Sequence, residues 1–354
     1  MNHKMAKQQK KIAVIGAGIA GIACARTLAQ AGHRVTVLEK GGRVGGRITS
    51  CETAFGTFDH GAQYFTVRDA RFQQALASTP GLCKTWSANA VRVLDPHGRV
   101  AEAALPKHEP HWVAAPSMDA LPRQWAQPLD SAGGVQLDTR VTHIERDTLD
   151  AARWQLQTSG AQDSTHVYSG FDAVLLAMPH ALAGGLLNQS HIAPAMAQQL
   201  QSVEVAPCWT LMLAFPQGVQ PTLSHLGPQW NAARSTHHRI AWLARESSKP
   251  GRGAIERWTV QASAAWSQEH LDDDGPRVQA KLLKAFAEVT GIHAEPSLAQ
   301  VHRWRWAKTQ TPLGRSHLWD ARAGIGLCGD WCLGHRVEDG FVSGLELALA
   351  VHRG

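Results

Sequence analysis

A glycine-rich turn between two apolar segments near the start of the chain constrains the fold more than any other feature. Ile12–Ile15 is typical of a buried strand, Gly16–Gly21 follows as Gly-Ala-Gly-Ile-Ala-Gly, and Arg34–Leu38 is typical of a second strand. The spacing between them predicts a helix that ends near Gly32. Such a strand–helix–strand unit places its strands parallel in one sheet, so the sequence predicts an α/β fold that begins with a Rossmann-like domain.

Each glycine of this turn has a separate expected role. Gly16 permits the tight turn, Gly18 lets the backbone approach a pyrophosphate, and Gly21 lets helix and strand pack closely. The helix N-terminus offers unpaired N–H groups and a partial positive charge to phosphates. Glu39 follows the second strand, where its carboxylate accepts hydrogen bonds from an adenosine ribose and repels a 2′-phosphate. The unit is therefore predicted to bind a dinucleotide other than NADP.

Composition limits the partners of the chain. A length of 354 residues is sufficient for two interleaved domains, and the net charge of +6 comes from scattered Lys and Arg, which argues against nucleic acid. Met1–Lys11 is basic and Ile12–Ala25 is apolar, as in a secretory signal, but the apolar run is too short to span a bilayer and contains the glycine turn. We expect a cytoplasmic protein with no membrane partner; the sequence leaves its oligomeric state open.

The cysteines and histidines indicate no metal site. Six cysteines include no Cys-x-x-Cys pair, and no Cys/His array has zinc spacing. Cys328 and Cys332 are candidates either for a redox dithiol or for packing around a cofactor, and their spacing favours packing.

A second glycine run follows Glu39. Gly45-Gly46-Arg47 resembles the motif that the FAD-containing amine-oxidase superfamily carries shortly after its ribose-binding acid. The resemblance implies that this turn brings further amides to the pyrophosphate and that the arginine adds charge, so the cofactor is FAD. It is noncovalent, because the cysteine-bearing segment of monoamine oxidases is replaced by Asp339–Phe341.

The same resemblance implies where the rest of FAD is bound. The acid of a late Gly329-Asp330 binds the ribityl chain or pyrophosphate, and the last helix, opening at Gly340, directs its N-terminus at the flavin. Val141 matches the position whose backbone holds adenine. The glycine turn and the resemblance together imply cofactor contacts from Gly16, Ala17, Gly18, Ile19, Ala20, Gly21, Glu39, Lys40, Gly45, Gly46, Arg47, Gly61, Ala62, Gln63, Tyr64, Val141, Met178, Gly329, Asp330, Glu338, Gly340, Phe341 and Val342.

Several further stretches resemble one family within the superfamily, renalase, and particularly its bacterial members. The resemblance runs from residue 11 to the C-terminus and rests on Asp59–Thr66 with Arg68-Asp69, Trp242–Arg245, Ser248–Pro250, His302–Trp304, Cys328–Cys332, Arg336–Glu338 and Ser343-Gly344. It implies oxidation of the 2- or 6-dihydro isomers of NAD(P)H, with hydride passing to flavin N5 and O₂ reoxidising the flavin to give NAD(P)⁺ and H₂O₂.

This chemistry needs no general base, because loss of hydride alone makes the nicotinamide ring aromatic. In agreement, the sequence has no Ser/His/Asp or Cys/His set with a recognisable signature. The candidate lining residues are Tyr64, Arg303, Trp304 and Lys308. Arg303 or Lys308 is the candidate cation that neutralises phosphate or assists O₂ reduction.

Two alternatives remain open, and a third is disfavoured. An oxidase of a small amine would use an aromatic cage, but Tyr64 and Tyr168 are the only tyrosines. A non-catalytic flavin-binding partner protein would show no substrate-driven flavin reduction. A lipid or carotenoid desaturase would need an apolar membrane-facing helix, which the sequence does not indicate.

The remaining pattern predicts an inserted domain. Glu256–Ala262 is typical of a strand, Pro276–Thr290 of an amphipathic helix, and Arg140–Glu145 with Trp154–Thr158 of a hairpin. We expect a discontinuous FAD-binding domain of residues 1–78, 130–180 and 301–354. A mixed-sheet α+β substrate domain is expected over 79–129 and 181–300, with short strands between Trp86 and Ala103.

Overall fold

The computed structural model describes residues 9–86, 91–101, 109–160, 164–216 and 231–354. The chain forms two compact units: Met1–Gly46, Pro122–Glu204 and Thr311–Gly354 make the first, and Arg47–Leu121 and Val205–Gln310 make the second. The sequence assigned residues 47–78 to the FAD domain, whereas this division groups them with the second unit. Residues 1–8 of the basic N-terminal run, and residues 87–90 and 102–103 of the predicted short strands, lie outside the described residues.

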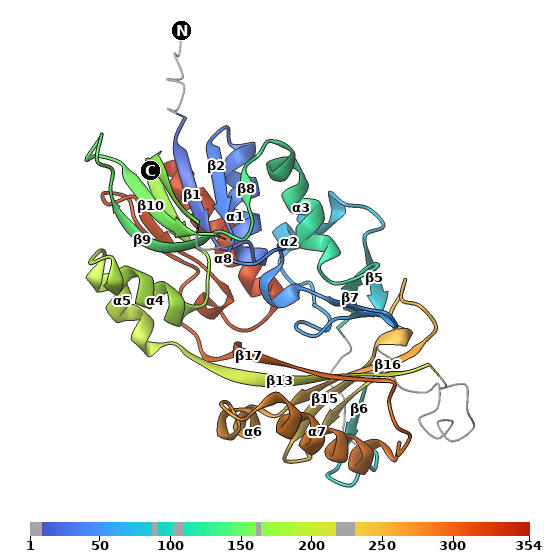
Figure 1. Ribbon diagram of the computed structural model, residues 1–354. Helices are drawn as coiled ribbons and strands as arrows, with labels where there is room; N and C mark the ends of the chain where they lie inside the picture. Colours follow the sequence, from blue (N-terminus) through green and yellow to red (C-terminus); the bar gives the residue numbers. More distant parts are fainter. Residues whose placement is uncertain (1–8, 87–90, 102–108, 161–163, 217–230) are drawn as a thin grey trace. The chain divides into compact units, whose positions relative to one another are not determined.

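The first unit contains a six-stranded, mostly parallel sheet (Figure 1). Its order is β18 (Leu318–Asp320), β19 (Ile325–Leu327), β12 (Ala173–Leu176), β1 (Lys11–Ile15), β2 (Arg34–Leu38), β8 (Val135–Gln136). Only β18 runs antiparallel to its neighbour. Ile12–Ile15 is buried, as expected for a strand in the middle of a parallel sheet. The predicted Rossmann-like arrangement is confirmed.

Helix α1 (Ile19–Gln30) connects β1 to β2, and α8 (Val337–Arg353) packs along it. The two helices approach closely: a Cβ on Gly344 would lie 2.1 Å from the carbonyl oxygen of Ala20. A Cβ on Gly340 would lie 2.8 Å from Cγ2 of Ile19. The last helix begins three residues before Gly340, the residue at which the sequence predicted its start.

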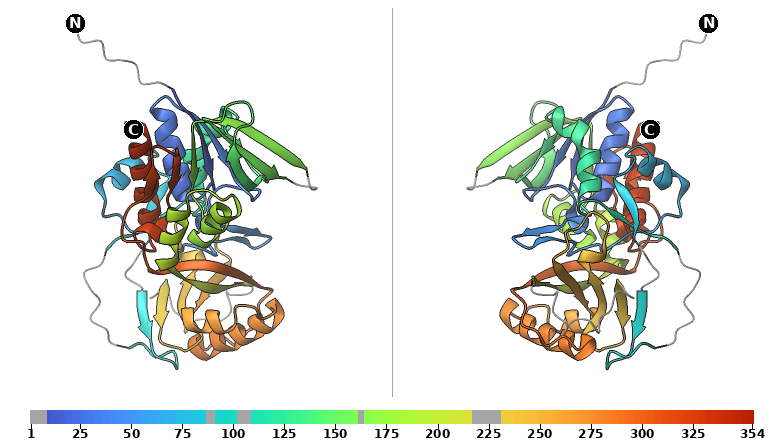
Figure 2. Two further views of the ribbon diagram at one scale, coloured as in Figure 1. Left: turned by 90° about the vertical axis from the view of Figure 1, so that its left-hand side faces the viewer. Right: turned by 90° about the vertical axis from the view of Figure 1, so that its right-hand side faces the viewer.

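A three-stranded antiparallel sheet completes the first unit together with the remaining helices (Figures 1 and 2). The predicted hairpin is confirmed, and a third strand extends it. These elements are β9 (Arg140–Arg146), β10 (Trp154–Ser159), β11 (Thr165–Phe171), α4 (His180–Gln189), α5 (Pro194–Gln199) and all but the start of α3 (Ala120–Ser131).

The second unit is built on a mixed six-stranded sheet whose one face is covered by helices α6 and α7 (Figures 1 and 2). The order is β17 (Leu298–Thr311), β13 (Glu204–Phe215), β16 (Glu256–Ala262), β15 (Ile240–Arg245), β14 (Ala232–Ser235), β6 (Val91–Leu94). The smaller elements are α2 (Ala70–Ala77), α6 (Ala264–Glu269), α7 (Gly275–Thr290) and the strand pairs β3 (Cys51–Thr53) with β4 (Gly56–Phe58) and β5 (Cys83–Trp86) with β7 (His111–Ala114).

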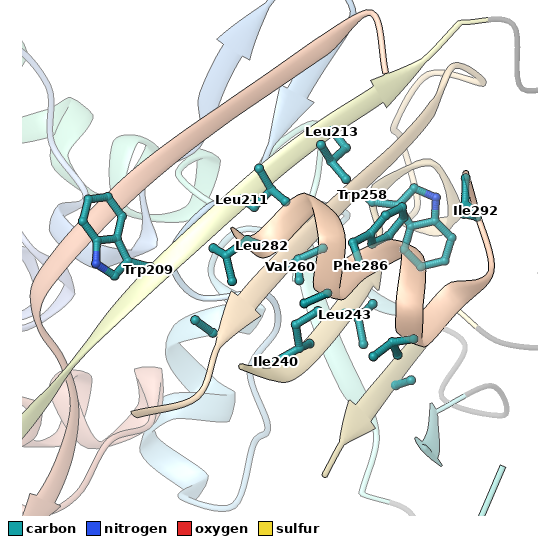
Figure 3. Packing of buried hydrophobic residues seen from close by; sticks show 14 of the residues in the cluster. Trp209, Leu211, Leu213, Ile240, Leu243, Trp258, Val260, Leu282, Phe286 and Ile292 are labelled. Atoms are coloured by element: carbon teal, nitrogen blue, oxygen red, sulfur yellow. The ribbon is translucent and has the colours of Figure 1, made fainter. Parts of the chain in front are cut away.

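Helix α7 follows the sequence signals closely. The side chain of Asp274 accepts a hydrogen bond from Arg277 N at 2.9 Å, and Gly291 ends the helix at φ 72°. Leu282 and Phe286 pack against sheet residues such as Val260, in the cluster of Figure 3. Because side chains alternate along a strand, every second residue of the sheet faces away from these helices. On β16 that opposite face carries Arg257, Thr259 and Gln261.

Candidate functional site

The two glycine runs lie side by side in the first unit. Gly18 and Gly45 form a parallel bridge, and Gly45 N donates to Ala17 O at 2.8 Å. Gly46 has φ 57°, and a Cβ there would lie 3.2 Å from Cα of Gly18. Two backbone turns that are 27 residues apart in sequence thus meet directly after β1, and their shared pyrophosphate site stays a prediction.

The first turn has the shape that a dinucleotide requires. A Cβ on Gly16, where φ is +106°, would lie 2.4 Å from Ala177 O, and one on Gly21 would lie 2.0 Å from Gly16 O. Gly18 differs, because nothing lies within 4 Å of the corresponding position. Its open side adjoins the first turn of α1, where the N–H groups have no partner within the helix. These residues fit a bound pyrophosphate.

Glu39 is already oriented at the end of β2. Its carboxylate accepts hydrogen bonds from Ala17 N at 2.8 Å and Gly41 N at 2.9 Å. Each oxygen keeps a further lone pair, so the half-buried side chain can also accept from ribose hydroxyls. Lys40 beside it is exposed.

The late Gly-Asp lies beside the start of both helices. A Cβ on Gly340 would lie 3.8 Å from Cβ of Asp330, and one on Gly329 would lie 2.2 Å from the indole nitrogen of Trp331. That indole donates to Met178 O at 2.9 Å. The structure therefore brings together Gly329, Asp330 and Gly340 with the N-terminal turn, as the sequence predicted.

The other predicted cofactor residues of the first unit are more scattered. Glu338 is buried in the first turn of α8, a position that favours an acid. Phe341 packs against Trp125 with ring centroids 5.5 Å apart, and Val342 is half-buried beside it. Val141 lies in β9.

The cysteines of the first unit are buried. Contact with Cys24 and burial raise the pKa of Cys328, and burial raises the pKa of Cys332. Thiols with raised pKa are poor nucleophiles, which fits the packing interpretation of the Cys328/Cys332 pair.

In the second unit, the Asp59–Tyr64 segment is held residue by residue. Trp304 Nε1 donates to His60 O at 2.9 Å, and Gln261 Nε2 donates to Gly61 O at 2.7 Å. Ala62 N donates to the carbonyl of Arg47 at 2.9 Å. A Cβ on Gly61 would lie 2.0 Å from the same carbonyl, so this position requires glycine. The side chain of Arg47 donates to Ala307 O at 3.3 Å.

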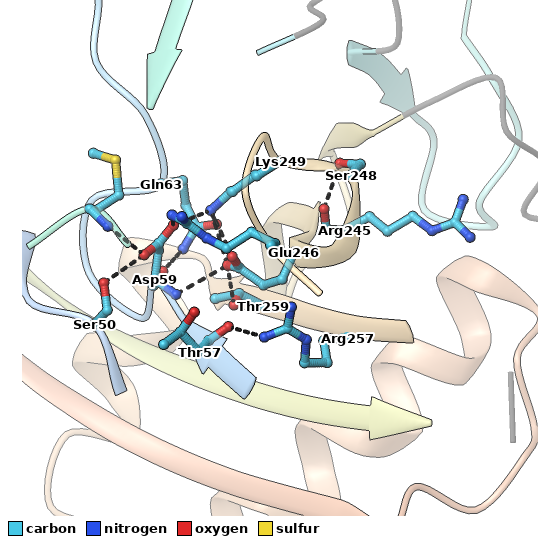
Figure 4. Close-up of polar contacts among 12 residues, drawn as sticks. Ser50, Thr57, Asp59, Gln63, Arg245, Glu246, Ser248, Lys249, Arg257 and Thr259 are labelled. Carbon is cyan, nitrogen blue, oxygen red and sulfur yellow. Dashed lines mark hydrogen bonds and ion pairs between the residues drawn. The ribbon is translucent and has the colours of Figure 1, made fainter. Parts of the chain in front are cut away.

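A buried charge network of Asp59, Glu246, Lys249 and Arg252 fixes the start of this segment (Figure 4). Lys249 Nζ lies 2.9 Å from Asp59 Oδ2 and 3.0 Å from the Glu246 carboxylate, and Arg252 Nη2 lies 2.6 Å from Asp59 Oδ2. All four side chains have zero exposure. The network joins residues 190 positions apart in the chain.

Neutral groups also donate to both carboxylates of the network. Ser50 Oγ donates to Asp59 Oδ1 at 2.6 Å, and Thr259 Oγ1 donates to Glu246 Oε1 at 2.8 Å. Burial alone would raise the pKa of Asp59, but the charges of Lys249 and Arg252 outweigh it and hold that pKa below the usual range. Burial, the largest effect on Glu246, raises its pKa despite the opposing charge of Lys249.

Two aromatic groups adjoin the segment. The Tyr64 cluster comprises Tyr64 with His111 at 4.1 Å, Trp242 at 5.5 Å and Trp86 at 6.4 Å between ring centroids. The indole N–H of Trp242 is buried and has no hydrogen-bond acceptor in the described part of the chain.

In the second group, the His302 ring lies 4.3 Å from that of Trp304 and 4.7 Å from that of His60. Burial lowers the pKa of His302, which favours its neutral form.

The structure does not bring all four predicted lining residues together. Trp304 binds the Asp59–Tyr64 segment, but Arg303 is its neighbour in β17 and therefore faces the other way. Arg303 donates to Leu271 O at 2.6 Å and lies over the Trp209 ring on the side of helices α6 and α7. Lys308 is exposed and shares the face of Trp304 by its even spacing.

The network and the Tyr64 cluster contain residues to which the sequence analysis gave no role: Glu246, Lys249, Arg252, His111 and Trp242. Lys249 and Trp242 do belong to stretches that carry the renalase resemblance. One sequence signal could have indicated the network: Lys249-Pro250 follows closely after an apolar strand. A lysine that becomes buried beside such a strand almost always has an acidic partner.

Two other features are absent from the described residues. These residues contain no group of three or more His, Cys, Asp or Glu side chains able to hold a metal ion. Among their helices, none has the length and apolar character needed to cross a membrane.

Comparison with protein families gives two matches. Residues 14–78 match the NAD(P)-binding Rossmann-like domain, and residues 102–352 match the flavin containing amine oxidoreductases. Among curated proteins, the chain is 51% identical over 51 residues to a 4,4'-diapophytoene desaturase of Staphylococcus aureus strain Newman. This match covers 14% of the chain and only 10% of the desaturase.

Solved structures share the fold over nearly the whole chain. A proposed protoporphyrinogen oxidase of Exiguobacterium sp. 255-15 has a TM-score of 0.74 at 15% identity, covering 98% of this chain and 100% of that one. Cyclohexylamine oxidase from Brevibacterium oxydans IH-35A has a TM-score of 0.72 at 14% identity, covering 98% and 99%. A putrescine oxidase variant has a TM-score of 0.73 at 11% identity, covering 98% of both chains.

The matched family spans most of the chain, and the glycine turns have the geometry that a dinucleotide cofactor requires. The protein is thus an FAD-dependent oxidoreductase, and its chain belongs to the family of flavin containing amine oxidoreductases.

Proposed function

We propose that the protein is a renalase-like oxidase of 2- or 6-dihydro isomers of NAD(P)H. One observation carries the proposal: stretches far apart in sequence that underlie the renalase resemblance are neighbours in the second unit. Asp59 pairs with Lys249, Tyr64 packs on Trp242, and His60 contacts Trp304. Their convergence on one segment supports a shared role in the same reaction.

The residues around the Asp59–Tyr64 segment suit hydride transfer from a dihydropyridine better than a reaction that needs a general base. Bound FAD would supply the hydride acceptor at N5, with O₂ as the oxidant that restores the flavin and is reduced to H₂O₂. The protein must orient the nicotinamide ring and exclude water. We assign ring contact to Tyr64 and Trp304. The indole N–H of Trp242, which has no acceptor among the described residues, is assigned to the carboxamide oxygen.

The charge around the segment supports a dinucleotide over an amine. The network itself is balanced, two carboxylates against two cations, and its carboxylates have no exposure. Neither carboxylate is therefore available to pair with an ammonium group. Arg257 adds a buried cation that donates to Thr57 O. An electron-rich, anionic dinucleotide suits these surroundings.

The second candidate is an oxidase of a small amine, which the matched family and the cyclohexylamine and putrescine oxidase folds favour. A cage built from tyrosines is disfavoured, because the sequence has only Tyr64 and Tyr168. Trp242 and Trp304 remain as aromatic substitutes.

The test is anaerobic flavin reduction followed by visible absorbance. The purified protein is mixed with borohydride-reduced NAD⁺, which contains the 2- and 6-dihydro isomers, and in parallel with pure NADH, a panel of amines and buffer. The proposal expects rapid bleaching by the isomer mixture alone. Bleaching only by an amine would establish the second candidate, and bleaching by none would point to a non-catalytic flavin protein.

A further inference from the structure

We propose that Lys249 is a positioning residue that sets the orientation of Tyr64 through Gln63. The role is defined by the proposed function, because Tyr64 is assigned there to the nicotinamide ring. The contact on which it rests, between a buried ammonium and the Asp59–Tyr64 segment, is independent of the substrate.

The ammonium of Lys249 has three acceptors. It lies 2.9 Å from Asp59 Oδ2, 3.0 Å from Glu246 Oε1 and 3.3 Å from Gln63 Oε1. Gln63, which is 5% exposed, also donates through Nε2 to the backbone carbonyl of Asp59. Lys249 therefore closes a loop of hydrogen bonds that fixes both the side chain and the backbone immediately before Tyr64.

Lys249 also supports the aromatic neighbours of Tyr64. Its Nζ lies 5.5 Å from the centre of the Trp86 ring, a cation–π distance. The Trp86 indole donates to Ser248 Oγ at 3.0 Å, so the turn that carries Lys249 holds this ring. Trp86 in turn is the outer member of the Tyr64 cluster. One side chain thus contacts both the segment before Tyr64 and the cluster around it.

Arg252 ties the same turn to a third segment. Its Nη1 donates to Ala114 O at 3.1 Å and also to Pro116 O, and its Nη2 donates to Asp59. His111, the ring nearest to Tyr64, belongs to the same strand as Ala114. Asp59 is therefore shared by two cations, one on the side of Gln63 and one on the side of His111.

The chain offers a direct readout of Tyr64. It contains two tyrosines, so protein labelled with fluorotyrosine gives two ¹⁹F NMR resonances, assigned with Tyr168→Phe. Tyr168 lies in the first unit and serves as an internal reference. The variants are Lys249→Met, which removes the ammonium, Lys249→Arg, which keeps a cation, and Gln63→Met, which cuts the link without leaving a charge unpaired.

The matched control is Arg245→Gln. Arg245 pairs with Glu256 at 2.8 Å and adjoins the same turn. Within the described residues, its side chain makes no hydrogen bond or ion pair with the Asp59–Tyr64 segment. Its loss should leave both resonances and the activity unchanged.

We expect Lys249→Met and Gln63→Met to shift or broaden the Tyr64 resonance and leave that of Tyr168 in place, with partial recovery in Lys249→Arg. With the dihydronicotinamide isomers, the limiting rate of flavin reduction should fall by at least about tenfold, since small misplacements of reacting groups have large effects on rate. The apparent substrate affinity should change less than this rate.

Three outcomes separate the hypotheses. An unchanged Tyr64 resonance in folded Gln63→Met overturns the positioning role, whatever the activity; this variant decides the matter if Lys249→Met does not fold. A shifted resonance with an unchanged limiting rate overturns it as well. A wild-type protein that no isomer reduces refutes the proposed function, and the NMR result then still decides whether Lys249 positions Tyr64.

Discussion

The cofactor turns of the first unit and the Asp59–Tyr64 segment of the second unit are both held rigidly, but by different means. The turns depend on backbone: Gly16, Gly21 and Gly45 are packed so that amides and carbonyls meet directly. The segment depends on side chains, with Lys249 and Arg252 converging on Asp59. A backbone-built site is sensitive to added volume, whereas a charge-built site is sensitive to the loss of one partner.

The largest expected effect comes from removing one charge of the network. Asp59→Asn leaves Lys249 and Arg252 with a single buried carboxylate, and breaking such a pair costs about 3–5 kcal/mol of unfolding free energy. Urea denaturation of the holoprotein measures the loss. Asp69→Asn is the control: Asp69 caps α2 near the surface, asparagine caps equally well, and a change below about 0.5 kcal/mol is expected. If the two variants lost equal unfolding free energy, the network would contribute no more to stability than a surface helix cap.

The next effect concerns the glycine turns. Gly21→Ala places a Cβ 2.0 Å from Gly16 O, and overpacking of this kind costs about 1–3 kcal/mol. FAD affinity, measured by flavin fluorescence on dilution, should fall by about 10- to 100-fold.

Gly18→Ala separates cofactor binding from folding. Nothing in the protein lies within 4 Å of the added methyl group, so stability should hold while FAD binding weakens. Gly185→Ala is the matched control, because its Cβ is equally unobstructed and lies in α4, away from the glycine turns. A Gly18→Ala protein that keeps full FAD affinity would contradict the pyrophosphate role of this turn.

The smallest effect is a pH dependence of stability. Glu246 has a raised pKa in the folded protein, so its contribution is fully present below the ordinary glutamate pKa of about 4.3 and is lost as the pH rises through the folded value. Between the ordinary and the folded pKa of Glu246, the unfolding free energy falls with pH by up to about 1.4 kcal/mol per pH unit. Glu246→Gln should remove this pH dependence. The measurement is urea denaturation of the wild-type protein and of Glu246→Gln at a series of pH values. The difference between their unfolding free energies isolates Glu246, because the histidine contributions are the same in both proteins. Asp59, with its lowered pKa, acts in the opposite sense and only at lower pH.

The same contrast explains what could be predicted from the sequence. Glycines at fixed spacing between strand and helix are a local requirement of the backbone, so Gly16–Gly21 could be placed in advance. Gly45 and Gly46 could be placed only through the resemblance to the FAD-containing amine-oxidase superfamily. The pairing of Asp59 with Lys249 bridges 190 positions and has no local pattern. Pairing at this separation becomes visible only in the folded chain.

One part of the site could have been predicted better. Arg303 and Trp304 were grouped as lining residues, although neighbours in a strand face opposite sides. The long strand Leu298–Thr311 confirms this rule, with Arg303 over Trp209 and Trp304 bound to His60. The alternation alone places Arg303 and Trp304 on opposite faces of the strand.

The most direct test of the account is a stoichiometric anaerobic titration of the flavoprotein with the separated 6-dihydro isomer of NADH. Flavin absorbance and the NAD⁺ released are measured together. The account predicts one NAD⁺ formed per flavin bleached, at a rate far above that of ordinary NADH. A flavin that stays oxidised with the 2- and 6-dihydro isomers but is bleached by a small amine would contradict it.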